Sequence, residues 1–114
     1  MTGATVDVQT SPDGTLVIRP RGVLGVDDAI ELRRTLIQAI RHTRPLRLVL
    51  HLGDVYGLDP INLGTFAAAC ELGNDHHVAV FLDHSSPALA DQLTAAGVPA
   101  HRLRHVGEGR ISST

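Results

Sequence analysis

The chain has no lysine and no tryptophan, one cysteine, and only three aromatic side chains. The absence of lysine excludes a Walker-A lysine, the phosphate-binding lysine of a kinase, and Schiff-base chemistry. The single Cys70 cannot form an internal disulfide bond. The few aromatic rings leave little surface on which nucleic-acid bases could stack. The missing lysine by itself therefore removes several classes of enzyme.

Charge and hydropathy narrow the class of protein further. Ten arginines stand against twelve acidic residues, a formal net charge of -2 at pH 7, so we expect no nucleic-acid partner. No apolar run approaches the roughly 20 residues of a membrane-spanning helix. The first residues have neither the basic nor the apolar region of a signal peptide. We therefore expect a soluble, cytoplasmic protein that does not insert into a membrane.

The first part of the chain predicts a hairpin followed by a helix. Residues 4–9 alternate small or apolar side chains with polar ones, as a half-exposed strand does. The turn Ser11-Pro12-Asp13-Gly14 leads to a second strand at 15–20, and the pair predicts an antiparallel hairpin. Residues 22–25 then connect to a helix at 27–41, where apolar side chains recur at helical spacing.

The rest of the chain alternates strands and helices. Two segments rich in Leu and Val predict buried strands, and a polar segment predicts a final edge strand. Two pairs of a preferred N-cap residue and a proline predict helix starts, because proline suits the first helical position. The strands are 46–52, 78–82 and 101–106, and the helices begin at Asp59-Pro60 and Ser86-Pro87. We expect these helices to end at Gly73-Asn74 and Gly97.

The order of these elements defines the fold class. Strands that alternate with helices predict an α/β domain whose sheet is mostly parallel, with an antiparallel first strand. About five strands and three to four helices would form one domain over residues 1–106. Residues 107–114 are rich in Gly and Ser and are expected to form a flexible tail.

The start of the helix after Asp59-Pro60 is the first candidate site. Its N–H groups have no partners in the helix, so a partner or an anion could arrive there. Asp59 is interpreted first as an N-cap and second as a contact for a partner. Ile61 and Leu63 cannot face the same way, because they are two residues apart on a helix. Leu63 fits the buried stripe, so we expect Ile61 to be exposed.

Three stretches resemble the STAS domain of anti-sigma factor antagonists, a domain also found in sulfate transporters and some lipid-transport complexes. The resemblance that they carry runs from about residue 4 to residue 106 and implies the STAS fold. They are Gly22-Val23-Leu24 with the helix after it, the stretch 48–63 that ends in Leu58-Asp59-x-x-x-Leu63-Gly64, and Leu-Ala-Asp-Gln-Leu-Thr-Ala-Ala-Gly at 89–97.

The departures from the family pattern bear on regulation. In the family, a Ser or Thr at this helix start is phosphorylated by a kinase that is also the anti-sigma factor. The resemblance places Pro60 and Ile61 at the hydroxyl positions and Asn62 at the motif glycine. Gly25 and His51 stand where the family carries acidic residues. Thr65 is the nearest hydroxyl, one turn into the helix, where we expect it to pack or to bond back to the chain.

Other chemistry was weighed against these observations. His101, Leu103 and His105 would share a strand face and His76-His77 are adjacent, but no carboxylate or thiol stands at ligand-like spacing, so we expect no metal. No nucleophile accompanies His51 and the nearby acidic residues, so we expect no catalysis. The arginines between positions 33 and 47 are interpreted as a solvated face or as a surface for an acidic partner.

The sequence therefore predicts a non-catalytic regulatory domain that binds an anti-sigma factor or a serine kinase-like protein, without a cofactor and without a phosphorylation switch. The predicted contacts are Asp59, Pro60, Ile61, Asn62, Thr65, Gly25 and His51. The alternative is a small-molecule sensor for a nucleotide or lipid, or a STAS subunit of a membrane transport complex. A homodimer is a further hypothesis, because the chain lacks the family's closing helix and a face would stay uncovered.

Overall fold

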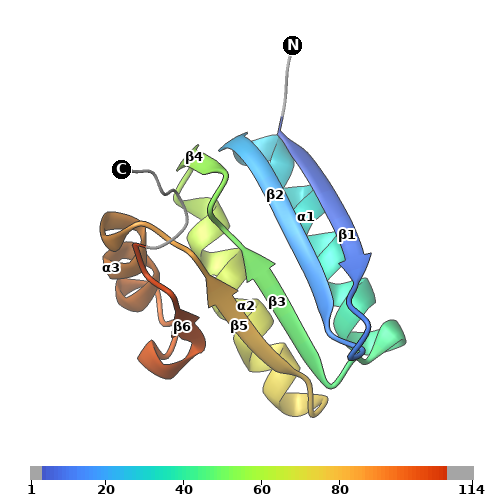
Figure 1. The fold of residues 1–114 in the computed structure, drawn as a ribbon. Helices are drawn as coiled ribbons and strands as arrows, with labels where there is room; N and C mark the ends of the chain where they lie inside the picture. Colours follow the sequence, from blue (N-terminus) through green and yellow to red (C-terminus); the bar gives the residue numbers. More distant parts are fainter. Residues whose placement is uncertain (1–3, 108–114) are drawn as a thin grey trace.

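A six-stranded sheet organises residues 4–107, the part of the chain that this computed structural model describes (Figure 1). The strands are β1 (Thr5–Thr10), β2 (Leu16–Leu24), β3 (Arg47–His51), β4 (Val55–Leu58), β5 (Ala79–Asp83) and β6 (Leu103–Arg104). The α-helices are α1 (Val26–Gln38), α2 (Ile61–Asp75) and α3 (Pro87–Ala95), with a π-helical turn at Ala39–Thr43 and a 3-10 turn at Ala100–Arg102.

The sheet is mixed but mostly parallel. Its main path has the order β1-β2-β3-β5-β6, and the short β4 pairs with β2 off this path. β1 runs antiparallel to β2, and the other pairs are parallel. The predicted fold class is therefore confirmed, with one strand more than the five expected.

All three helices lie on one face of the sheet; in Figure 1, α1 and α2 are seen behind it and α3 beside β6. Successive parallel strands follow one another in the same direction across the sheet, so right-handed crossovers place each helix on the same side. A single apolar core results, in which Leu50 of β3, Phe66 of α2 and Leu93 of α3 are fully buried. In the described part of the chain, no helix covers the opposite face of the sheet.

Arginine side chains cover part of this open face. Val49 stands in register with Val17 on one side and Phe81 on the other, and only 7% of it is exposed. The guanidinium groups of Arg104 and Arg102 lie 4.3 Å and 5.2 Å from the centroid of the Phe81 ring. Such stacking hides the ring while it keeps the charges in water.

Several boundaries differ from those predicted. The first helix, expected at 27–41, is Val26–Gln38 followed by the π-helical turn. β2 continues through Leu24, because its end pairs with β4, with a register shift beside Gly22 at φ 100°. α2 does not end at Gly73-Asn74 but runs to Asp75, and the left-handed residue is His77 at φ 61°. The last strand has only two residues, because Ala100–Arg102 forms a 3-10 turn. The predicted tail from 108 onward lies outside the described residues.

The start of α3 is confirmed in detail. The Ser86 Oγ accepts a hydrogen bond from the Leu89 N–H at 3.1 Å, and Pro87 occupies the first turn. Gly97 follows the helix at φ 112°, a conformation that glycine adopts without strain. These local signals were sufficient because they depend on few distant contacts.

Candidate functional site

The start of α2 presents Pro60 and Ile61 to solvent, as the sequence predicted. The Asp59 Oδ1 accepts a hydrogen bond from the Ile61 N–H at 3.1 Å, so Asp59 caps the helix although regular geometry begins only at Ile61. The Ile61 side chain is 52% exposed, whereas Leu63 packs partly buried against the core. The helix therefore begins with an accessible apolar residue.

Asn62 holds this helix start in place from within. It is fully buried, and its Nδ2 donates to the carbonyl oxygens of Leu24, Gly25 and Asp59 at 3.1–3.2 Å. These bonds tie α2 to the junction of β2 and α1. Asn62 was predicted to contact a partner, but its burial gives it an internal, positioning role.

Gly25 is brought next to Asn62 by the same bonds. Its N–H donates to the Asp28 Oδ2 at 2.7 Å, and its carbonyl accepts from Asn62 and from the first turn of α1. The backbone of Gly25 thus joins the starts of α1 and α2. Any contact with a partner here would be made by backbone, because Gly25 has no side chain.

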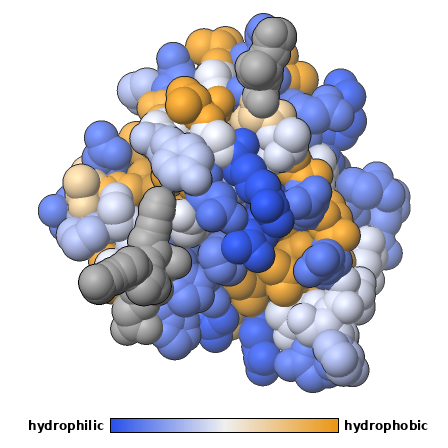
Figure 2. Space-filling view, turned by 45° about the horizontal axis from the view of Figure 1, so that its top comes forward, coloured by the Kyte–Doolittle hydropathy of each residue, from blue (hydrophilic) through white to orange (hydrophobic). Residues whose placement is uncertain are grey.

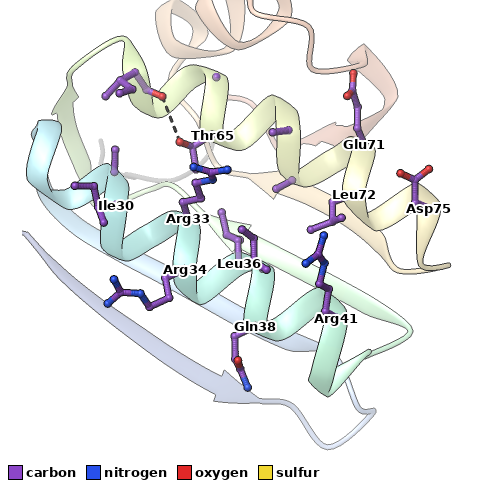
Figure 3. Close-up of a pocket in the computed structure, with 16 residues that line it drawn as sticks. Ile30, Arg33, Arg34, Leu36, Gln38, Arg41, Thr65, Glu71, Leu72 and Asp75 are labelled. Carbon is purple, nitrogen blue, oxygen red and sulfur yellow. Dashed lines mark hydrogen bonds between the residues drawn. The ribbon is translucent and has the colours of Figure 1, made fainter.

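Thr65 bonds back to the chain, as expected. Its Oγ1 donates to the Ile61 carbonyl at 3.3 Å, one turn earlier in the same helix (Figure 3). The only hydroxyl within the first turns of α2 is therefore committed to the helix backbone.

His51 lies apart from these residues, on the open face of the sheet. Leu50 points into the core, so the next side chain points to the opposite face. There His51 stands in register with Asp83, and Asp83 with Arg104, whose guanidinium binds the carboxylate at 2.7 Å. On the neighbouring strand β2, Ile18 pairs with Leu50, and Arg19 is the next residue. The Arg19 guanidinium binds the Asp54 carboxylate at 2.9 Å.

Figure 2 shows strongly hydrophilic side chains gathered across the middle of this surface, with apolar areas beside them. The charged side chains near His51 and Asp83 change the pKa values of their neighbours. Burial lowers the pKa of His51 below its ordinary value of 6.5, and Arg19 and the neighbouring His84 lower it further. The hydrogen bonds that the Arg104 guanidinium donates to Asp83 raise the pKa of Arg104.

Three histidine rings lie against one another where three parallel strands end, a cluster that was not predicted. The rings of His51 and His84 have centroids 4.6 Å apart, and those of His84 and His105 are 5.2 Å apart. Each histidine ends or directly follows one of three neighbouring strands, and that placement was a signal in the sequence. His101 lies in the 3-10 turn and not on the strand. Residues 4–107 contain no group of three side chains arranged to hold a metal ion.

Cys70 does not offer a nucleophile. It lies on the buried side of α2, and desolvation raises the pKa of its thiol to about 11. A thiol with that pKa stays protonated near neutral pH and reacts slowly.

Exposed apolar residues gather at the ends of β2 and β4 and along the starts of α1 and α2. Within residues 4–107 they are Val23, Val26, Ile30, Tyr56 and Ile61, each more than half exposed. β4 brings Tyr56 beside the end of β2, and Ile30 and Ile61 line the same groove between α1 and α2. Large exposed apolar side chains grouped in this way are typical of an interaction surface.

The fold is that of the STAS domains of anti-sigma factor antagonists, as the resemblance of the sequence implied. No family model and no curated protein sequence matches the chain. Solved structures do, and they identify the fold alone, because their sequences are less than 25% identical to this one.

Three of these structures define the likeness. The phosphorylated form of the Bacillus cell fate determinant SpoIIAA has a TM-score of 0.74 at 15% identity, over 91% of this chain and 94% of its own. A variant of RsbS from Moorella thermoacetica has a TM-score of 0.75 at 18% identity, over 89% and 86%. A sulfate transporter family protein from Wolinella succinogenes has a TM-score of 0.70 at 16% identity, over 89% and 84%. In residues 4–107, no helix has the length and hydropathy to cross a membrane.

Proposed function

We propose that this domain is a non-catalytic regulatory module that binds an anti-sigma factor or a serine kinase-like protein through the start of α2. The observation that carries the proposal is the half-exposed Ile61, held at a capped helix start whose orientation the buried Asn62 determines. A preorganised apolar contact of this kind loses little conformational entropy when it binds. The likeness in fold to the anti-sigma factor antagonist SpoIIAA supports the same interpretation.

We propose further that phosphorylation does not switch this surface. A phosphate group would add nearly two negative charges at the helix start, but Pro60 and Ile61 have no hydroxyl to accept it. The nearest hydroxyl, on Thr65, is bonded to the helix backbone. After incubation with ATP and the kinase partner, intact-mass measurement is expected to show no added phosphate. A phosphate mapped to residues 60–65 would contradict the proposal.

Binding through Ile61 is tested by capture from the cells that make the protein. The full chain is used as bait beside the variant Ile61→Glu, and each eluate is analysed by mass spectrometry. The control variant is Leu46→Glu, because Leu46 is 86% exposed and lies just before β3, at the opposite end of the sheet. Placing a charge at the centre of an interface weakens it by about tenfold to a hundredfold.

We expect the partner to be captured by the unmodified chain and by Leu46→Glu, and lost with Ile61→Glu. Equal capture by both variants would place the interface elsewhere. Loss with both variants would show that the capture depends on general surface hydropathy and not on the start of α2.

A second candidate is a subunit of a transport complex. Its support is the likeness in fold to the Wolinella protein and to the murine anion transporter Slc26a9. The match covers 18% of the Slc26a9 chain. Capture of an integral membrane protein in the same experiment would favour it. A small-molecule sensor would instead show a raised melting temperature with nucleotides or lipids, because a ligand that binds the native state stabilises it.

A further inference from the structure

α1 and α2 lie side by side on the sheet and leave an open groove of about 940 Å³ between them (Figure 3). Its lining is largely apolar and combines the small residues Ala29, Gly64 and Ala68 with the larger side chains of Leu36, Ile37 and Leu72. Ile30 and Ile61 line it near the starts of the two helices. The groove therefore runs on from the proposed binding surface.

The floor allows close approach of another chain. A methyl group added at Gly64 would have no heavy atom within 4 Å, so the space above this residue is empty. Gly64 and Ala68 are four residues apart and thus share one face of α2. A second backbone could pack closely against this low ridge, as helices do where small residues meet.

The two walls of the groove carry opposite charges. Arg33 and Arg41 of α1 line one side and reach toward α2, whereas Glu71 and Asp75 line the α2 side and point away from α1 (Figure 3). Among residues 4–107, none of these four makes an ion pair, in contrast to Arg34, which binds Glu31. Both walls therefore keep their charges available for a partner.

We propose that this groove binds one amphipathic α-helix of the partner protein, so the inference rests on the proposed function. The helix would place an apolar stripe over the floor, acidic residues over the α1 wall and basic residues over the α2 wall. α2 has 15 residues and is about 22 Å long, which accommodates about four turns of a docked helix. Because the walls differ in sign, they also determine in which direction the helix lies.

A substitution in the floor tests the groove separately from the helix start. Ala68→Gln places a long polar side chain where the apolar stripe would lie, and Ala95→Gln makes the same change on α3. Ala68 and Ala95 are both exposed alanines in helices, so neither substitution places the glutamine in the core. Ala68→Gln would bury an unpaired amide, so we expect it to weaken the affinity for the captured partner by about tenfold or more. We expect Ala95→Gln to leave that affinity unchanged.

A designed peptide tests the charge pattern without the natural partner. Two 18-residue helical peptides share one apolar stripe; the first has one acidic and one basic edge, and the second has two acidic edges. In nuclear magnetic resonance titrations of the full chain, we expect the first to bind more tightly and to shift signals of α1 and α2. The two peptides differ only at the edge that faces α2, so we expect Glu71→Arg with Asp75→Arg to remove the advantage of the first peptide, and added salt to reduce it.

The outcomes separate the two proposals. If Ile61→Glu loses the partner and Ala68→Gln keeps it, the proposed function stands and the helix-binding groove is wrong. If Ile61→Glu keeps the partner, the proposed function itself fails. Equal affinity of the two peptides would overturn the charge pattern. If Ala68→Gln instead converts a dimer of the unmodified chain to a monomer in sedimentation, the occupant is a second copy and not a partner helix.

Discussion

Replacing Asn62 with alanine is expected to lower the free energy of unfolding by about 2–3 kcal/mol. The Nδ2 of Asn62 has two hydrogens and lies 3.1–3.2 Å from three carbonyl oxygens. Each of these carbonyls also accepts a backbone N–H, from Asp59, Ala29 and Asn62 itself, so none is left without a bond. The loss is therefore two net hydrogen bonds of about 1 kcal/mol each, with a smaller addition for the cavity.

The measurement is urea unfolding followed by far-ultraviolet circular dichroism, because the chain has no tryptophan to report by fluorescence. Asn74→Ala is the control, since Asn74 is exposed on the same helix and loses only an exposed hydrogen bond from Arg102, so stability should change by less than about 0.5 kcal/mol. Asn62→Asp should cost more than alanine, because an ionised carboxylate would face the same three carbonyl oxygens and could not donate. Equal stabilities of Asn62→Ala and Asn74→Ala would refute the assigned role.

Three further predictions concern packing, ionisation and reactivity. In thermal melts, Gly73→Ala should destabilise the protein by about 1–3 kcal/mol, because the new methyl would lie 2.6 Å from the Val78 oxygen and from Val80 Cγ2. Gly64→Ala places its methyl in open space and should stabilise the protein by about 0.5–1 kcal/mol. A Gly64→Ala variant less stable than Gly73→Ala would contradict this reasoning. The free energy of unfolding should fall as the pH drops through 6.5, because the lowered pKa of His51 makes the unfolded chain bind more protons there. His51→Gln should flatten this dependence and the exposed control His101→Gln should not. Cys70, whose pKa is raised to about 11, should react with a thiol reagent at pH 8 only when urea unfolds the chain, and rapid labelling of the native protein would refute its burial.

Local signals in the sequence predicted the helix starts well. The pairs Asp59-Pro60 and Ser86-Pro87 each combine a side-chain acceptor with a fixed φ, and both caps form the expected hydrogen bonds. The exposure of Ile61 also followed from helical spacing alone. These predictions succeeded because the relevant atoms lie within one helical turn of each other.

Ends of elements were predicted less well, because distant contacts decide them. β2 extends to Leu24 because β4 pairs with its end. No local sequence pattern predicts a strand as short as β4. Gly73 was expected to end α2, but it allows the helix to pass close to Val78 and Val80. A glycine required for close approach and a glycine required for a turn look the same in a sequence.

The role of Asn62 and the place of His51 also depended on the tertiary structure. The acceptors of Asn62 include Leu24 and Gly25, 38 and 37 residues earlier in the chain. His51 was grouped with the helix start because the resemblance places it where the family carries an acidic residue, whereas the alternation of side chains along β3 directs it to the open face.

The sequence by itself determined the α/β class, the succession of strands and helices, and a helix start without a phosphorylatable hydroxyl, because periodicity, caps and residue chemistry are local properties. Only the tertiary structure decided that the helices share one face, that three histidine rings lie against one another at the strand ends, and that oppositely charged walls enclose a groove. Each of these depends on how strands distant in the chain are ordered and aligned, and that order arises from packing of the whole core.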